Sequence, residues 1–139
     1  MILYLDTSAF VKLIHREEGS EEIRNAYARV EAVASSSLAK VEIHSALARL
    51  RREGTADEVL GGWLAAFAQM WEGMARVDMD RASDGACALC LRHPLRTLDA
   101  IHLASAMLLR AEGGLEVVFA TWDGKLKEAA RQERFQVLP

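Results

Sequence analysis

The chain begins with MILYLDTS, residues 1–8, an apolar run that ends at the carboxylate of Asp6. Residues 115–123, LEVVFATWD, repeat this arrangement near the other end of the chain and stop at Asp123. Both runs indicate buried strands of a parallel sheet, and in such a sheet ligands bind outside the carboxyl ends of the strands. We therefore expect Asp6 and Asp123 to lie side by side at the functional edge.

Helical periodicity alternates with short strand patterns along the rest of the chain. In residues 38–53, Ile43, Leu47 and Leu50 belong to one apolar stripe that Gly54 ends. This alternation predicts crossover connections, and therefore a three-layer α/β/α sandwich with a mostly parallel central sheet. The expected helices are 8–15, 21–29, 38–53, 56–74, 81–93, 97–112 and 124–134, and the expected strands are 2–5, 30–36, 75–79, 115–121 and 136–138.

Composition indicates one folded unit. The 139 residues are 51% hydrophobic, enough for one core and too few residues for two ordinary domains, so we expect a single domain over residues 1–139. Charge interrupts every apolar stretch before about 18 residues, which predicts no membrane span. The N-terminus lacks the basic start and cleavage site of a secretory signal, and we expect a cytoplasmic location.

The two cysteines, Cys87 and Cys90, have the C-x-x-C spacing of redox and zinc motifs. They lie one turn apart in a segment with a helical pattern, and the chain has no second pair to complete a zinc site. Free cysteine is among the most buried residue types, so we expect two buried, inert thiols.

The net charge of −3 is not that of a strongly basic nucleic-acid binder. However, Lys40, Arg49, Arg51 and Arg52 gather along one expected helix, and a basic rim around an acidic pocket suits a phosphate backbone. We take Lys40, Arg49 and Arg52 as candidate nucleic-acid-binding residues. The alternative is a solvated helix end, where cations complement the helix dipole.

Four acidic residues are candidates for a shared site, although three of them have ordinary explanations. Asp6 and Asp123 could cap helices, and the helix dipole favours Asp99 in a first turn. Glu42 is harder to explain, since no neighbour at i±3 or i±4 can pair with it and an unpaired buried charge is costly. Asp99 has almost no polar neighbour in its helix besides His102, which we expect to form a hydrogen bond inside the helix layer. Together the four acids predict a divalent-metal site.

Four segments in this order resemble the PIN-domain nucleases, and within them the VapC-type toxins of bacterial and archaeal toxin–antitoxin pairs. The resemblance implies a compact α/β/α sandwich, an acidic cluster that binds Mg²⁺ or Mn²⁺, and hydrolysis of single-stranded or looped RNA. It also implies a homodimer and a cognate antitoxin that occludes the site. Trp122 stands where the family more often has Phe, and the last Asp of the pattern, here Asp123, varies within the family. The segments are YLDTS at 4–8, KVEI at 40–43, LDAIHLA at 98–104 and ATWDGKL at 120–126.

Hard oxygen ligands without clustered His or Cys favour Mg²⁺ or Mn²⁺ over zinc. We expect Asp6 and Asp99 to bind the first ion directly, while Glu42 and Asp123 orient its waters or help to hold a second. A metal-activated water would then attack the phosphodiester in line. The hydroxyls of two supporting residues could steer a ligand or water; these are Ser8 and Thr121.

Other interpretations remain open at this point. The chain could be a PIN-like module without turnover that binds RNA or a protein partner. A phosphatase of the haloacid-dehalogenase type would need a second acid two residues after Asp6, where this chain has Ser8. The series of apolar residues on the expected hairpin of helices could form a dimer or antitoxin surface, although a core face is the preferred interpretation; the series is Trp63, Leu64, Phe67 and Trp71. Strand-end and helix-start positions explain Asp78, Asp80 and Asp84.

Overall fold

The computed structural model describes all 139 residues and contains five strands and seven helices. Local sequence sets many of the element boundaries. The side chain of Asp6 caps the first helix by accepting from the Ala9 N–H, and Gly114, in a left-handed conformation, ends the longest one. In chain order the elements are β1 (Ile2–Leu5), α1 (Thr7–Ile14), α2 (Ser20–Tyr27), β2 (Ala32–Ser36), α3 (Ala39–Arg52), α4 (Asp57–Glu72), β3 (Ala75–Val77), α5 (Met79–Arg92), α6 (Thr97–Gly113), β4 (Val117–Ala120), α7 (Gly124–Gln132) and β5 (Gln136–Leu138).

The five strands form one sheet in the order β3-β2-β1-β4-β5, and every neighbouring pair is parallel. The central strand β1 pairs with β2 on one side, Ile2 opposite Ala32, and with β4 on the other, Ile2 opposite Val117. Successive strands run outward from β1 in one direction as far as β3, and the chain then returns to β4 on the opposite side. The boundary between β1 and β4 is therefore a topological switch point, the place where parallel sheets bind ligands.

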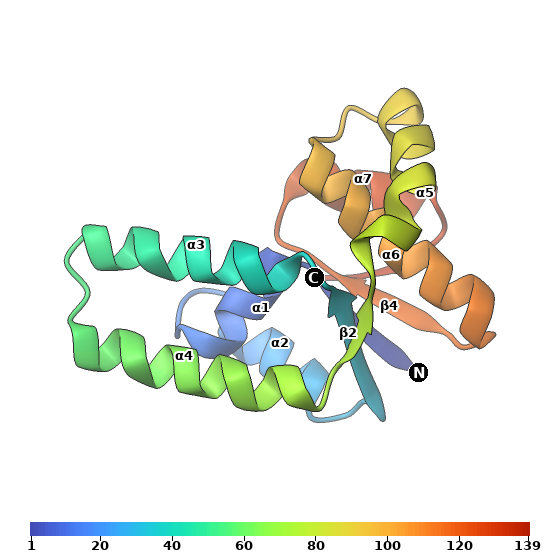
Figure 1. The fold of residues 1–139 in the computed structure, drawn as a ribbon. Helices are drawn as coiled ribbons and strands as arrows, with labels where there is room; N and C mark the ends of the chain where they lie inside the picture. The colour runs from blue at the N-terminus through green and yellow to red at the C-terminus, as the bar shows by residue number, and fades with distance from the viewer.

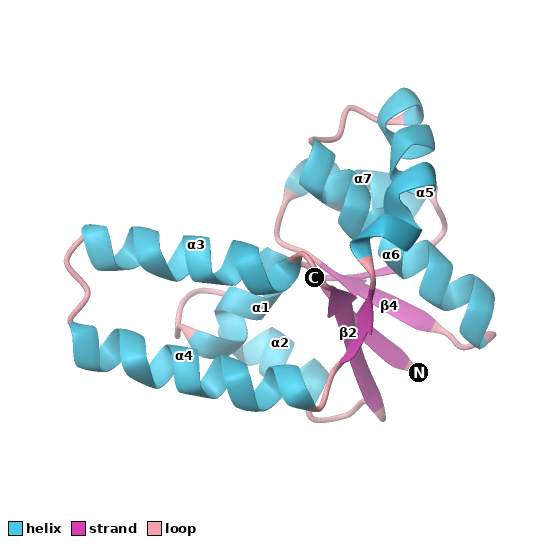
Figure 2. Ribbon diagram, viewed as in Figure 1, coloured by secondary structure: helices cyan, strands magenta, loops and turns pink.

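Helices cover both faces of the sheet, which confirms the expected α/β/α sandwich (Figure 2). Alternate residues of β1 face opposite layers, because side chains in a strand alternate in direction. Tyr4 belongs to a core shared with α5, α6 and α7, whereas Leu3 and Leu5 belong to a second core shared with α1 to α4. The segment that carries Asp6 is thus anchored in both cores at once.

Helices α3 and α4 form a hairpin that reaches away from the sheet, as Figure 1 shows. Phe67 is buried and its ring lies 5.2 Å from that of Phe10, centroid to centroid, while Trp63, Leu64 and Trp71 pack against the same core. The core interpretation of this apolar series is therefore confirmed. None of the helices is long and apolar enough to cross a membrane.

The prediction of buried thiols was wrong. Cys87 and Cys90 are both free and exposed. Helix α5 turns Ala82, Ala86 and Leu89 inward, and each cysteine lies one residue beyond that stripe. Packing of α5 on α6 selects this face.

Several expected elements also extend beyond the observed ones. For example, β2 begins at Ala32 rather than at residue 30, because its pairing with β1 begins there.

Candidate active site

All four predicted acids line one cleft of about 470 Å³ at the carboxyl ends of β1 and β4. They come from four separate places in the chain. Asp6 directly follows β1, Glu42 lies in the first turn of α3, Asp99 lies in the first turn of α6, and Asp123 caps α7. The structure therefore brings the four predicted residues together around one hollow.

Asp6 is the deepest of the four, only 4% exposed. The Ser8 hydroxyl lies 2.7 and 2.9 Å from its two oxygens, the Thr121 hydroxyl donates to Oδ2 at 2.5 Å, and the Ala9 N–H donates to Oδ1 at 2.8 Å. Burial raises the pKa of Asp6, although nearby His102 and these donors oppose the shift. The carboxylate is thus held rigidly, with no basic side chain in ion-pair contact.

The two supporting hydroxyls are themselves fixed. Ser8 Oγ accepts from the Trp122 N–H at 2.9 Å, and Thr121 Oγ1 accepts from the Asp123 N–H at 3.1 Å. Each hydroxyl is therefore oriented to donate its proton toward Asp6. Ser8 lines the cleft, whereas Thr121 is fully buried behind Asp6 and supports that carboxylate without facing the hollow.

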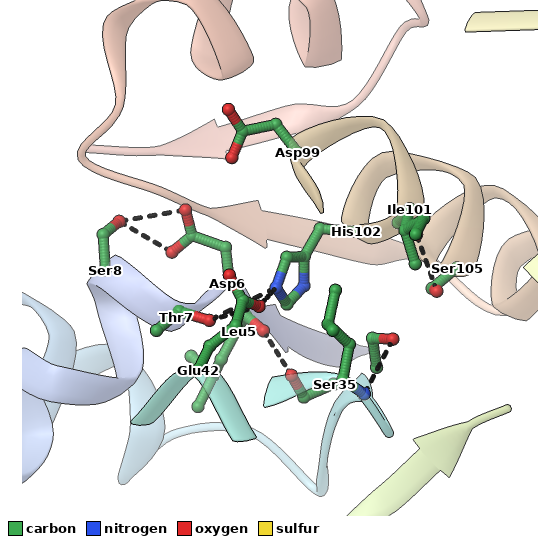
Figure 3. Close-up of polar contacts among 12 residues, drawn as sticks. Leu5, Asp6, Thr7, Ser8, Ser35, Glu42, Asp99, Ile101, His102 and Ser105 are labelled. Atoms are coloured by element: carbon green, nitrogen blue, oxygen red, sulfur yellow. Dashed lines mark hydrogen bonds and ion pairs between the residues drawn. The ribbon is translucent and has the colours of Figure 1, made fainter. Parts of the chain in front are cut away.

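Glu42 finds its partner in another helix, beyond its own helical neighbours. His102 Nε2 lies 2.6 Å from Glu42 Oε1, and the Thr7 hydroxyl donates to the same oxygen at 2.8 Å (Figure 3). Partial burial alone would raise the pKa of Glu42, but its hydrogen bonds and the charge of His102 outweigh burial and lower it. An ionised carboxylate only accepts hydrogen bonds, so we assign the Nε2 proton to His102.

His102 is itself buried and held from behind. Its Nδ1 lies 3.1 Å from the hydroxyl of Tyr4 on β1, and burial raises the pKa of that phenol, so Tyr4 stays protonated. The expected hydrogen bond within the helix layer was wrong, because the ring of His102 points toward the strand ends and finds its partners on the central strand β1 and on α1 and α3 across the sheet edge. Tyr4, His102 and Glu42 form one continuous polar chain from the core to the cleft.

Asp99 and Asp123 share a partner that the sequence analysis did not name. Arg96 Nε lies 3.0 Å from Asp99 Oδ2, and its Nη2 lies 3.6 Å from Asp123 Oδ2. The contact with Asp99 is chiefly responsible for raising the pKa of Arg96. Asp99 is an i+3 neighbour of Arg96, so that spacing was the signal that could have identified this pair from the sequence.

Basic side chains surround the acidic floor, but not all of those predicted. Arg49, Arg96 and Lys12 line the cleft, and Arg52 lines an adjoining hollow beside Arg49. Lys40 is exposed and lines neither. Lys12 bonds Glu17 at 2.9 Å, and its ammonium lies 5.3 Å from the centre of the Trp122 ring.

The donor chemistry of the cleft fits a hard divalent cation, since every candidate ligand is a carboxylate oxygen. The buried Asp6 carboxylate, with no basic side chain paired to it, also favours a cation nearby. In this arrangement, however, no group of three or more His, Cys, Asp or Glu side chains converges closely enough to hold a metal ion. Arg96 holds two of the four carboxylates instead.

The sequence matches the PIN domain family over residues 3–132. It is 33% identical over 140 residues to ribonuclease VapC49 of Mycobacterium tuberculosis, covering 99% of this chain and 95% of that protein. It is 36% identical over 129 residues to ribonuclease VapC46 of the same organism, covering 93% and 90%.

Solved structures show the same fold at lower identity. The crystal structure of M. tuberculosis VapC20, described as a sarcin-ricin loop cleaving toxin, superposes with a TM-score of 0.66 at 16% identity over the full length of both chains. FitAcB from Neisseria gonorrhoeae superposes with a TM-score of 0.64 at 15% identity, covering 100% of this chain and 97% of that one. With its parallel sheet and the four acids at the switch point, the chain belongs to the PIN-domain family, among its VapC-type members.

Proposed function

We propose that this protein is a divalent-metal-dependent endoribonuclease, the toxin of a toxin–antitoxin pair, which hydrolyses phosphodiester bonds in RNA. The observation that carries the proposal is the cleft at the β1–β4 switch point, where four carboxylates from four distant segments face one hollow with a basic rim. Four acids scattered over more than a hundred residues meet only if the fold gathers them. The similarity to VapC ribonucleases supports RNA as the substrate class.

Within this proposal the acids would hold Mg²⁺ or Mn²⁺, with Asp6 and Asp99 as direct ligands and Glu42 and Asp123 as ligands of its waters. A bound ion of this kind supplies Lewis-acid polarisation of the phosphate and lowers the pKa of a coordinated water. The chain's own contribution is rigidity. Ser8 and Thr121 fix Asp6, so that carboxylate needs little reorganisation when the substrate arrives.

Glu42 has a distinct part in this arrangement. Its Oε1 accepts from both Thr7 and His102, which leaves Oε2 free of protein hydrogen bonds. A free carboxylate oxygen at the cleft can accept a proton or hydrogen bond from a water placed there. We assign to Oε2 the orientation of the attacking water, and to Thr7 and His102 the positioning of Glu42.

The basic rim would bind the RNA backbone. Arg49 in α3 and Arg96 just before α6 both line the cleft, and Arg52 extends the positive surface into the adjoining hollow. Cations so placed contact phosphates without reading base identity. Lys40 would contribute only to a longer backbone track, since it lies outside both hollows.

We extend the proposal to partners on the strength of family membership. A VapC-type protein implies a cognate antitoxin that covers the cleft, and a homodimer as the assembled form. Size-exclusion chromatography with light scattering tests the dimer, and co-expression with the protein encoded next to this gene tests the antitoxin.

The decisive test is metal-dependent cleavage of a total RNA pool, with the new ends mapped by sequencing. Wild-type protein should yield discrete new ends with Mg²⁺ or Mn²⁺ and none with a chelator. Asp6→Asn should yield none under either condition, while the control Asp84→Asn, at an exposed carboxylate of α5, should cleave as wild type does. RNA binding without cleavage by the wild type would instead favour a catalytically silent RNA-binding module.

A further inference from the structure

Arg96 stands between two of the four acids. It immediately precedes α6, and its guanidinium reaches Asp99 in that helix and Asp123 at the start of α7. Neither of these two carboxylates forms an ion pair with any other side chain. One arginine therefore provides all the direct positive charge on this side of the cleft.

The contacts use carboxylate oxygens that face the cleft, where a divalent ion would also be attracted. Arg96 faces the Oδ2 oxygens of both Asp99 and Asp123, at 3.0 and 3.6 Å. An ion bound to those oxygens would bring its positive charge to within a few ångströms of the guanidinium, where like charges repel. The guanidinium and the ion therefore compete for the negative charge of these two carboxylates.

The side chain of Arg96 can also move away from the two aspartates, because it is largely exposed to solvent. Its side chain is 79% exposed, whereas those of Asp99 and Asp123 are 16% and 34% exposed. An exposed arginine gains little from an ion pair and is readily solvated elsewhere. The two aspartates are the fixed partners, and the arginine is the mobile one.

We propose that Arg96 is an exchangeable counter-cation of the acidic cluster, which a divalent ion displaces from Asp99 and Asp123, and which then binds a phosphate of the RNA at the rim. This inference rests on the proposed metal-dependent function. In its present position the guanidinium contacts two of the four carboxylates, and no three of the four converge closely enough to hold an ion. A planar guanidinium released at the rim suits a phosphate, which it can bind through two parallel hydrogen bonds.

The first test measures Mn²⁺ binding alone, without RNA, by isothermal titration calorimetry and by the electron paramagnetic resonance signal of the free ion. Arg96→Gln should bind Mn²⁺ roughly two- to tenfold more tightly than wild type, the range expected for the loss of weak, exposed ion pairs. Arg16→Gln is the matched control: Arg16 is also 79% exposed but lies outside the cleft, and its removal should change the affinity less than twofold.

An Mn²⁺ affinity of Arg96→Gln equal to or weaker than that of wild type overturns the inference. If wild type binds Mn²⁺ and cleaves RNA while Arg96→Gln binds the ion no better, only the inference fails. If neither protein binds Mn²⁺ at millimolar concentration, the proposed function fails with it. Tight binding by Arg96→Gln together with weak binding by wild type supports both.

The second test asks whether Arg96, once the ion is bound, contacts a phosphate of the RNA, which electrostatic repulsion between Arg96 and the ion would not by itself produce. At saturating Mn²⁺, with an oligonucleotide that spans a mapped cleavage site, Arg96→Gln should raise KM several-fold more than Arg16→Gln does. Arg96→Lys retains the charge without the planar fork, so its KM should lie between those of wild type and Arg96→Gln. An unchanged KM in Arg96→Gln excludes the phosphate contact.

Discussion

Gly19 permits a close contact at the wall of the cleft. It precedes α2 with φ of +86°, and a Cβ built on it would lie 2.6 Å from Nε1 and 2.8 Å from Cε2 of Trp122. Trp122 in turn precedes Asp123, and its N–H donates to Ser8. The substitution Gly19→Ala therefore tests whether this contact holds the Trp122–Asp123 segment in place.

Two costs add at this position. An alanine in the left-handed region costs about 1–2 kcal/mol, and forcing a methyl group into an occupied space costs about 1–3 kcal/mol more. The expected destabilisation is therefore about 2–5 kcal/mol. For a chain of this size, about 3–4 °C per kcal/mol converts this cost to a fall in Tm of roughly 6–20 °C.

The assay is urea unfolding followed by tryptophan fluorescence and circular dichroism. Gly114→Ala is the backbone control, because Gly114 has φ of +58° and nothing within 4 Å of the added Cβ, so it should cost only about 1–2 kcal/mol. In a double-mutant cycle, Trp122→Ala should recover about 1–3 kcal/mol of the cost of Gly19→Ala. Equal costs for the two glycine variants, together with additive effects in the cycle, would refute the reasoning.

Three further predictions follow from the polar contacts of the cleft. Burial raises the pKa of Asp6, so the stability that this carboxyl contributes is present below its unfolded pKa and is lost as pH rises through its folded pKa. Without metal, the urea midpoint of Asp6→Asn should therefore equal or exceed that of wild type at pH 7, and the difference should shrink toward pH 4. A difference in midpoint that grows on acidification contradicts this prediction. His102→Ala removes the partner of Glu42 and should lower the free energy of unfolding by about 2–4 kcal/mol, whereas an unchanged urea midpoint would show that the polar chain contributes nothing. Millimolar Mg²⁺ or Mn²⁺ should raise the Tm of wild type, because an ion that binds only the folded state adds about 2.7 kcal/mol to the free energy of unfolding at a hundredfold excess over Kd. The same ions should raise the Tm of Asp99→Asn much less, and equal shifts in the two proteins would place the ion elsewhere.

The predictable part of the fold is the part that local pattern controls. Apolar strand runs, the stripe along residues 38–53 and the glycine that ends it are short-range signals, so the element order and the parallel sandwich followed from them. The cysteines of α5 show where that reasoning ends. Cys87 and Ala86 are both compatible with an apolar helix face, and only the approach of α6, close enough that a Cβ on Gly85 would lie 3.4 Å from Ala104, determines which face is buried.

For the site, the sequence alone named the four acids that line the cleft, because three of them lie at strand ends or helix starts, Glu42 has no pairing partner at i±3 or i±4, and their motifs resemble those of PIN-domain nucleases. Their ordinary roles were also correctly anticipated, since Asp6 and Asp123 do cap α1 and α7. The partners of the acids depended on the tertiary structure. Glu42 meets His102 across 60 residues of sequence, and Thr121 meets Asp6 across 115, because parallel crossovers bring distant strand ends to one edge of the sheet. Charge, burial and pKa depend on that convergence. Sequence spacing could therefore name the carboxylates, while only the folded chain decided which is held rigid by hydroxyls, which accepts a hydrogen bond from histidine and which are held by Arg96.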